Sequence, residues 1–523
     1  MRFSDKAKFK LLREACKLSE REKWKKWGLE DKIIERIVDG FVSAYPYYGN
    51  DFAKKIVRKI GENMACVFRN KLADSREETA RGIFNLIVIY ADKLRETREK
   101  LGHGLFTIVI NPTNVCNRKC KECYIGSSQV GMDGRFPRRE MSVDDMSGII
   151  EQMKNYYGTN FVTWSGGEPC LRLDKIISVL KKHDDIASLM FTNNDFLNSE
   201  TIEKIAETGN LFIGNSFEGS REYTDRIRGE NAYDKAMKAM QLETEKGIFF
   251  GPSITPTNEN IDEITNEEFA KFLIKQGAGF IYYFANMPIS INVDKCFNYL
   301  LSPAQRLKLN EFKSSRILEG DRILYMDFWN DGALVQGCMA GGQNYVNFSP
   351  PHMTKEKINE HVKKFGYSEK NVVTAILPCV FLQGIAGFVM SDGSVIAKKE
   401  KYVNIPYFIE NDESMKSVRE GFQKQIRERM KNGEHWLGSA PCMFYDWPEE
   451  GLSRFADNFI AFQPTFRIHE FQYLKKMKKL SDMWKSHIIR EYPNMIERLN
   501  EKYSLGLESY IEEQRGVARK LAV

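Results

Sequence analysis

Three cysteines within eight residues are the strongest chemical feature of this sequence. Cys116, Cys120 and Cys123 have the spacing C-x3-C-x2-C. Thiolates are the usual ligands of iron–sulfur clusters, and a cubane cluster has four irons. Three ligands therefore hold three irons and leave the fourth open to a chelating ligand. The alternatives are a zinc site and a chance grouping, but zinc usually takes four ligands in paired spacing, and no fourth Cys or His is close in the sequence.

Short apolar stretches alternate with amphipathic helices from about residue 105 and should position these cysteines. This alternation predicts parallel strands joined by right-handed crossovers. Six such units are too few for a closed eight-stranded barrel, so we expect an α/β fold with a partial (β/α)6 TIM-like barrel core. Ser142 and Ser199 are expected to cap two of the helices. The strands are expected at 105–110, 161–164, 187–192, 211–216, 248–254 and 280–284, and the alternation should stop after about 300.

The turn Gly166-Gly167-Glu168-Pro169 follows the second expected strand. Together with the cysteine spacing after the first strand, it resembles the radical S-adenosylmethionine (SAM) superfamily. The resemblance implies that backbone carbonyls of this turn bind the amino group of SAM, while the glycines permit close approach. It also implies an enzyme, an oxidoreductase or a transferase, with a [4Fe–4S] cluster and SAM as cofactors. Such an enzyme cleaves SAM reductively to a 5′-deoxyadenosyl radical, which abstracts hydrogen from a peptide, protein or other small-molecule substrate.

Further residues that would contact SAM follow from the same resemblance. Asn193 ends the third strand where the family often has T-N-G, although Asn194 replaces the glycine. Ser216, Glu218 and Arg228 match the fourth-strand segment, whose polar groups face SAM. A salt-bridged surface pair is the alternative interpretation of Glu218 and Arg228. Glu122 stands where the family often has an aromatic residue, so Tyr124 is the candidate for stacking on the adenine.

Three isolated cysteines, Cys338, Cys379 and Cys442, stand in Gly/Pro-rich contexts. They resemble the SPASM or twitch extension of many radical SAM proteins, which implies a second, auxiliary iron–sulfur cluster. A fourth ligand would complete it, with His352 and Asp392 as candidates. The alternative is three buried structural thiols, since free Cys is commonly buried.

The expected organisation has four parts. Residues 1–100 form a helical region, 101–300 the radical SAM core, 301–460 the auxiliary α+β extension and 461–523 a helical tail. Ten cysteines and a polar start without an apolar segment predict a reducing, cytoplasmic setting. The net charge of +6 comes with no dense basic block beside aromatic residues, so no nucleic acid partner is expected. The expected protein partner is an electron donor such as a flavodoxin or ferredoxin.

Two other functions compete with this interpretation. A non-catalytic iron–sulfur redox protein would need the cysteines but would have no use for the Gly-Gly-Glu-Pro turn. A peripheral lipid-modifying radical SAM enzyme would place a basic helix face on a membrane surface. Lys475, Lys476, Lys478 and Lys479 form such a face, which an ordinary solvated helix explains equally well.

Overall fold

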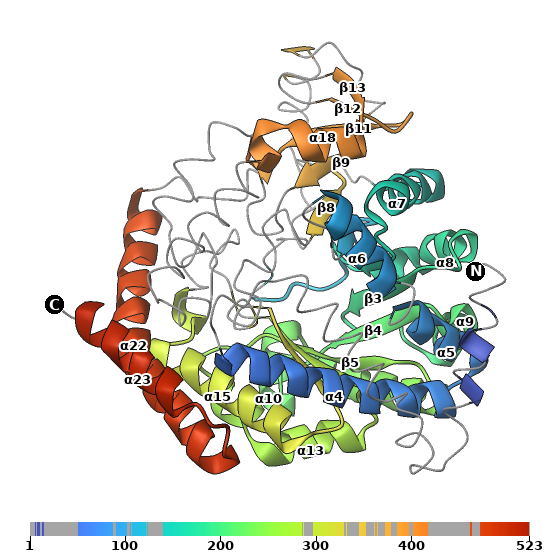
Figure 1. Cartoon of the computed structure of the whole chain (residues 1–523). Coiled ribbons are helices and arrows are strands. Elements are labelled where there is room, and N and C mark those ends of the chain that lie inside the picture. Colours follow the sequence, from blue (N-terminus) through green and yellow to red (C-terminus); the bar gives the residue numbers. More distant parts are fainter. Residues whose placement is uncertain are drawn as a thin grey trace.

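The computed structural model gives the arrangement of most of the chain between residues 51 and 416 and of its C-terminal helices (Figure 1). The residues that the structure describes are 6, 8–10, 13–14, 51–86, 90–101, 105, 107–121, 123, 140–284, 286, 297–328, 331, 345–351, 360, 363–364, 372–377, 384–396, 401–416, 461–462 and 471–521.

A mixed sheet forms the centre of the described structure. Its strand order is β13-β12-β11-β9-β8-β1-β2-β3-β4-β5-β6-β7, and strands β1 to β6 are parallel and in sequence order. This confirms the six predicted strands and the partial TIM-like barrel. Their bounds are β1 Thr107–Ile110, β2 Phe161–Trp164, β3 Ala187–Thr192, β4 Leu211–Ser216, β5 Phe250–Ile254 and β6 Phe280–Tyr283.

The alternation does not stop near residue 300, and that prediction was wrong. Helix α15 (Pro303–Glu319) leads to β7 (Leu324–Asp327), which pairs parallel to β6. On the other side, β8 (Tyr345–Ser349) pairs parallel to β1. Strand β7 has only four residues, too few to show a clear alternation of apolar and polar residues in the sequence. In the fold, the open edge of β6 provides hydrogen-bond partners for its backbone.

Helices cross between the parallel strands, and their ends follow capping chemistry. Ser142 caps α7 as predicted, in a capping box with Asp145. Asn198, rather than the predicted Ser199, caps α9, and Gly209 ends it in the left-handed conformation. The crossover helices are α7 Val143–Tyr157, α8 Leu173–Lys182, α9 Ser199–Thr208, α10 Arg221–Arg228, α11 Ala232–Glu245, α12 Ile261–Ile264 and α13 Glu267–Lys275.

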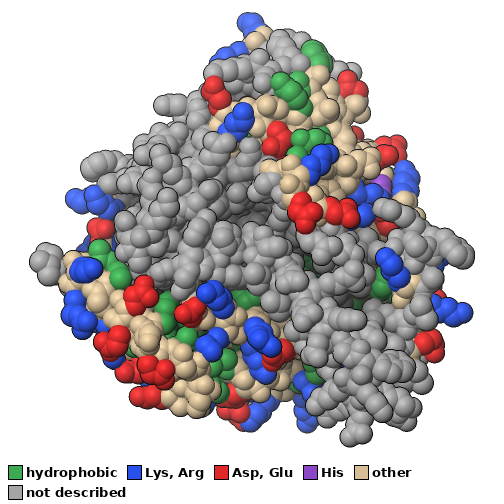
Figure 2. Space-filling view, in the orientation of Figure 1, with side chains coloured by type: hydrophobic (Ala, Val, Ile, Leu, Met, Phe, Trp, Pro, Cys, Tyr) green, Lys and Arg blue, Asp and Glu red, His purple; other side chains and the backbone are tan. Residues whose placement is uncertain are grey.

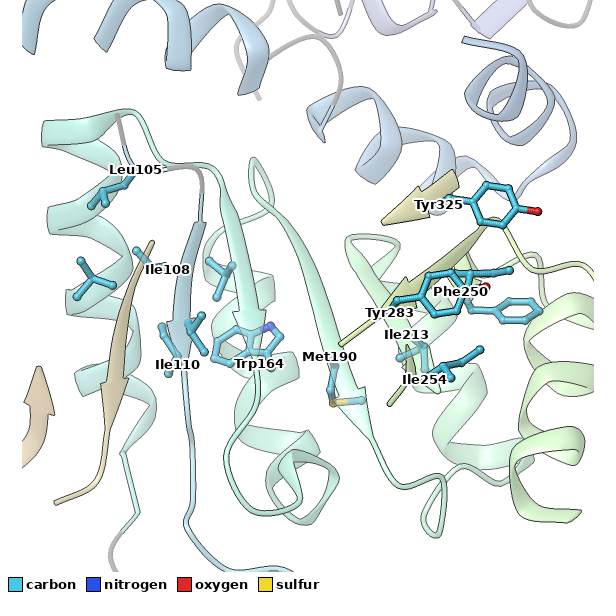
Figure 3. Close-up of a cluster of buried hydrophobic side chains, with 14 of the residues drawn as sticks. Leu105, Ile108, Ile110, Trp164, Met190, Ile213, Phe250, Ile254, Tyr283 and Tyr325 are labelled. Atoms are coloured by element: carbon cyan, nitrogen blue, oxygen red, sulfur yellow. The ribbon is translucent and has the colours of Figure 1, made fainter. Parts of the chain in front are cut away.

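The two faces of the parallel strands bury different side chains. Ile110 of β1, Trp164 of β2 and Ile213 of β4 belong to a large core shared with the crossover helices (Figure 3). On the opposite face, Phe161 and Phe212 belong to a second core. Successive residues of a strand alternate between these faces.

Two N-terminal helices, α4 (Asp51–Asp74) and α5 (Glu77–Phe84), complete this second core, whereas Leu101 of α6 (Tyr90–Leu101) packs against the first. Phe68 of α4 and Phe84 of α5 are buried there, and the Phe68 ring centre lies 5.9 Å from that of Phe249. Because Phe249 immediately precedes β5, α4 and α5 cover the amino-terminal end of the strands. The carboxyl ends are thus left for the site.

The C-terminal part adds an antiparallel extension and two helices. Strand β9 (Val372–Leu377) pairs with β8 and with β11 (Gly387–Met390), and β12 (Ser394–Ile396) and β13 (Lys401–Asn404) follow. The turn at Asp392-Gly393 joins β11 to β12. The remaining elements are η4 Phe297–Tyr299, β10 Gly384–Ile385, α18 Ile405–Asn411, β14 Ala461–Phe462, α22 Phe471–Tyr503 and α23 Glu508–Leu521.

The described surface is mixed in charge. On the face shown in Figure 2, basic and acidic side chains are interspersed over the coloured part of the molecule. Among the described residues, no helix is both long and apolar enough to cross a membrane.

Candidate functional site

The loop that carries Cys116, Cys120 and Cys123 leaves the carboxyl end of β1. Its first residues are fixed to the neighbouring strand β8. The Asn111 N–H donates to the Phe348 carbonyl at 2.9 Å, and the Asn114 amide donates to the Pro350 carbonyl at 3.0 Å. The loop therefore starts from a rigid base before it reaches the first cysteine.

The Gly-Gly-Glu turn after β2 lies directly against this loop. The Gly167 N–H donates to the Thr113 carbonyl at 3.0 Å, and the Glu168 N–H donates to the Val115 carbonyl at 2.8 Å. A Cβ on Gly167 would lie 2.1 Å from the Val115 carbonyl oxygen, closer than any side chain can stand. Gly166 has φ +109°, which favours glycine. The glycines therefore allow two backbones to interlock immediately before Cys116.

The Glu168 side chain turns away from solvent and holds the end of β3. Its carboxylate accepts hydrogen bonds from the Asn193 N–H at 2.8 Å, from the Thr192 hydroxyl at 2.7 Å and from the Cys170 N–H at 3.0 Å. Burial raises the pKa of Glu168, and these three donors oppose that rise. Glu168 thus connects the turn after β2 to the end of β3, and Pro169 opens the short helix η3 (Pro169–Arg172).

Asn193 and Asn194 bring the end of β3 to the cysteine loop. The Asn193 amide donates to the Asn117 side-chain oxygen at 2.8 Å and lies 3.9 Å from the Cys116 sulfur. Asn194 has φ +70°, in the left-handed region that glycine favours and asparagine tolerates. Asn194 can therefore adopt the left-handed backbone conformation that the glycine of T-N-G would adopt at this position.

Arg118 connects the cysteine loop to the loop after β3 and to the end of α10. Its guanidinium donates to both oxygens of Asp195, at 2.7 and 2.5 Å, and to the Arg228 carbonyl at 2.8 Å. Asn117 and Lys235 also donate to Asp195. Burial disfavours the charged Asp195, but these donors outweigh it and lower the pKa of the carboxyl below its usual value.

Glu218 and Arg228 form the salt bridge of the alternative interpretation, but the pair is largely buried rather than on the surface. Glu218 is 1% exposed, and its carboxylate accepts from the Arg228 guanidinium and from the Thr255 N–H. Ser216 ends β4 on the same face as Phe212, away from the crossover helices. The Lys121 N–H donates to the Ile227 carbonyl at 3.1 Å, so the end of α10 also contacts the cysteine loop.

A family model provides the deciding comparison. Residues 110–272 match the radical SAM superfamily, and this segment contains both the cysteine loop and the interlocked turn. Residues 110–272 of the chain form a radical SAM domain. Its cofactors, a [4Fe–4S] cluster and SAM, are those that the family resemblance implies.

The individual proteins that match this chain have low sequence identity to it. Residues of this chain are 28% identical over 158 positions to Fe-coproporphyrin III synthase of Methanosarcina barkeri and 27% identical over 157 positions to pre-heme d1 synthase of Dinoroseobacter shibae. These matches cover 30% and 29% of this chain and 38% and 37% of the relatives, so the chain spans less than two fifths of their length. SuiB of Streptococcus suis bound to the precursor peptide SuiA aligns at 17% identity with a TM-score of 0.44, covering 63% of this chain and 70% of SuiB.

Two cysteine thiols of this radical SAM domain, Cys116 and Cys120, are shielded from water, and this shielding raises their pKa values. The pKa of Cys116 is raised to about 12 and that of Cys120 to about 11, chiefly by burial and in part by the neighbouring cysteines. Binding of iron requires thiolates and releases the protons. Within the described part of the chain, no three His, Cys, Asp or Glu side chains are arranged to hold a single metal ion.

The residues beside the radical SAM cysteines fit a polar cofactor. The buried side-chain oxygen of Asn111 has no hydrogen-bond partner among the described residues. A Cβ on Gly166 would lie 2.9 Å from the Asn111 Cβ, so this amide stands next to the predicted SAM turn. A buried acceptor at such a position needs a donor, which the amino group of SAM would supply.

The radical SAM site therefore contains most of the predicted residues and several that were not predicted. Cys116, Cys120, Cys123, Asn193, Ser216, Glu218, Arg228 and the Gly-Gly-Glu-Pro turn all lie at the carboxyl ends of β1 to β4. Tyr124, Cys338, Cys379, Cys442 and His352 lie outside the described residues. Sequence analysis missed Asn111, Arg118 and Asp195, although Arg118 stands between two cysteines and Asp195 directly follows Asn193-Asn194.

Proposed function

We propose that this chain cleaves SAM reductively and uses the resulting radical to abstract hydrogen from an organic substrate. The observation that carries the proposal is the interlock between the Gly166-Gly167 turn and the backbone just before Cys116. A cysteine loop fixed against a glycine turn would serve a ligand bound to both, and a redox protein without SAM would not need it.

The chain's own residues hold and orient the reactants in this proposal. Cys116, Cys120 and Cys123 would hold three irons of a [4Fe–4S] cluster, and the Asn111 amide and the glycine turn would hold the amino group of SAM. When bound, the cluster supplies one electron that breaks a C–S bond of SAM, giving methionine and a 5′-deoxyadenosyl radical. The radical takes a hydrogen atom from the substrate and becomes 5′-deoxyadenosine.

The position of the cysteine loop and its ion pairs at the carboxyl ends of the strands also supports this chemistry. The Glu218–Arg228 pair and the Arg118–Asp195 pair close the cysteine loop against β3 and β4. Paired buried charges keep fixed dipoles around a site while limiting the access of water. We infer that these pairs position the cluster loop and shield the radical.

The test begins with anaerobic reconstitution with iron and sulfide, followed by addition of SAM and a reductant. We expect release of 5′-deoxyadenosine, with loss of that release in each of Cys116→Ala, Cys120→Ala and Cys123→Ala. Cys66→Ala is the matched control, because Cys66 lies in α4 and should leave activity unchanged. Wild-type protein that binds the cluster but releases no 5′-deoxyadenosine would contradict the proposal.

We further propose that Cys338, Cys379 and Cys442 hold an auxiliary iron–sulfur cluster. Leu377, at the end of β9, pairs with Asn347 of β8, so the described strand ends nearest to Cys338 and Cys379 lie together. Because β8 is parallel to β1, these ends face away from the carboxyl end of β1, where the Cys116 loop begins.

The auxiliary cluster can be tested by counting iron. About eight irons per chain would support two clusters, and about four would leave only the core cluster. Cys338→Ala should retain 5′-deoxyadenosine release and reduce the iron count by about four. An unchanged iron count in this variant would remove the auxiliary proposal.

An electron donor and a reducing compartment complete the proposed function. Cluster reduction requires a one-electron donor, for which a flavodoxin or ferredoxin is the natural class of partner. None of the described cysteines forms a disulfide bond; they are Cys66, Cys116, Cys120, Cys123 and Cys170. Free thiols and an open cluster persist in a reducing setting, so we propose a cytoplasmic location.

A further inference from the structure

A groove of about 730 Å³ lies between the start of α15 and the first half of α22. Ser302 and Pro303 form one wall, and one face of α22 forms the other. The radical SAM chemistry proposed above uses none of these residues. The volume is in the range of sites that bind small molecules.

The α22 wall of this groove is strongly basic. Its charged or titratable lining residues are Lys475, Lys478, Lys479, His487 and Arg490, with Asp482 as the acid among them. They recur three or four positions apart, so they share one helix face. The opposite face of α22, with Met477, Trp484 and Ile488, is buried. The basic stripe is therefore held in place by the packing of the helix.

Charge is unevenly divided along α22. Residues 471–490 contain six Lys and Arg and one Asp, whereas residues 491–503 contain two Lys and Arg and three Glu. In the second half, Arg498 donates to Glu311 at 2.6 Å and Lys502 to Glu319 at 2.9 Å. Both acceptors are on α15, and residues 303–310 of α15 contain no acid. Ion pairs therefore link the two helices away from the groove, and residues 303–310 of α15 place no carboxylate in it. On the α22 wall, Arg490 pairs with Glu491 at 2.9 Å.

The two walls are fixed relative to each other. The Arg306 guanidinium of α15 stacks on the Trp484 ring of α22, 3.8 Å from its centre, and both side chains are buried. A cation on an indole face is a favourable contact, particularly where it is shielded from water. The groove thus keeps its shape without a ligand, which lowers the entropic cost of binding.

We propose that this groove binds a phosphate-bearing ligand. Several cations on one helix face attract a multiply charged anion more strongly than a single carboxylate, and the ammonium groups of lysines bind phosphate as point charges. Met483, which is 50% exposed, lies on the same wall and provides an apolar contact beside the charges. The phosphate comes either from a soluble phosphorylated molecule or from a phospholipid headgroup.

The test compares the full-length protein with the triple variant Lys475→Gln/Lys478→Gln/Lys479→Gln. Its matched control is Lys181→Gln/Lys204→Gln/Lys238→Gln, which removes three exposed charges from α8, α9 and α11. One arm measures binding of inorganic pyrophosphate by calorimetry. The other measures co-sedimentation with phosphatidylcholine vesicles, with and without phosphatidylglycerol.

We expect the groove variant to bind roughly tenfold more weakly than wild type and the control variant to bind as wild type does. An effect in the pyrophosphate arm assigns a soluble ligand, and an effect confined to vesicles with phosphatidylglycerol assigns a lipid headgroup. Equal binding by the groove and control variants in both arms, or no binding by wild type in either, would overturn the proposal. The substituted lysines are exposed, so circular dichroism should show the same fold in all three proteins.

Discussion

The guanidinium of Arg118 donates two hydrogen bonds to the carboxylate of Asp195, which lies 77 positions away in the sequence. Both side chains are nearly buried, at 8% and 9% exposure. Because Arg118 lies between Cys116 and Cys120, this pair fixes the cysteine loop to the loop after β3. A bidentate arginine restricts orientation as well as distance.

We predict strong coupling between Arg118 and Asp195. Removing one partner of a buried ion pair typically costs about 3–5 kcal/mol because the other charge stays buried and unpaired. Arg118→Ala and Asp195→Ala should each lower the urea stability and the iron content after reconstitution, and the double variant should cost less than their sum. Urea denaturation and iron analysis of the three variants measure both effects.

The chain provides a control pair for this experiment. Arg221 and Asp234 form a bidentate pair between α10 and α11, with side chains 55% and 56% exposed. Their coupling should be below about 1 kcal/mol, as for exposed ion pairs in general. Equal coupling energies for the two pairs would show that burial of the Arg118–Asp195 pair does not strengthen its stabilisation of the cysteine loop.

A second prediction concerns Gly167. The Cβ of Gly167→Ala would stand 2.1 Å from the Val115 carbonyl oxygen, so the turn and the cysteine loop must separate. We expect this variant to reconstitute with much less iron than wild type. Gly148→Ala in α7 meets nothing within 4 Å and should stabilise the fold by about 0.5–1 kcal/mol. Normal iron content and normal SAM binding in Gly167→Ala would mean that the interlock is dispensable.

Sequence reasoning located the strands and the cysteines because their signals are local. Three of the predicted strands, 161–164, 187–192 and 211–216, have the observed bounds. Each is a short apolar run between polar residues, which confines a strand to a few positions. The cysteine spacing likewise needs no knowledge of the rest of the chain.

The contacts that position the cysteines depend on residues far apart in the sequence, and no local pattern reports them. In the sequence, Arg118 looks like an ordinary charged loop residue, because its contact with Asp195 exists only in the folded chain. Glu168 was assigned to SAM through its turn, whereas its carboxylate holds Asn193 at the end of β3. The capping error was of another kind, since Asn198 and Ser199 are adjacent and both are good N-cap residues.

The third prediction tests Glu168 as a positioning residue. Its carboxylate accepts from Asn193, Thr192 and Cys170, and an amide has only one oxygen for such donors. Glu168→Gln should therefore destabilise the protein by about 1–3 kcal/mol and weaken SAM binding by displacing Asn193. Thr192→Val, which removes one donor, should show a smaller effect of the same kind. Glu222→Gln, exposed in the first turn of α10, is the control and should change neither quantity.

The fourth prediction concerns Glu243, a buried carboxyl on α11. Burial raises its pKa from 4.5 to about 8, against the opposing hydrogen bond from the Asn215 amide at 2.7 Å. The folded protein therefore holds this proton between pH 4.5 and about 8, where the unfolded chain has lost it. Stability from this group is complete below the lower value and falls by up to about 1.4 kcal/mol per pH unit across the interval.

Glu243→Gln removes the ionisation and keeps an oxygen for Asn215 to donate to. Urea denaturation of cluster-free protein under argon at several pH values compares the two chains. We expect the stability of wild type relative to Glu243→Gln to decline from about pH 5 to about pH 8, because only wild type must bury a charge or bind a proton. Asp234→Asn, at an exposed site, should leave the wild-type pH dependence over this interval intact. A constant difference between wild type and Glu243→Gln would show that this carboxyl titrates normally in the folded protein.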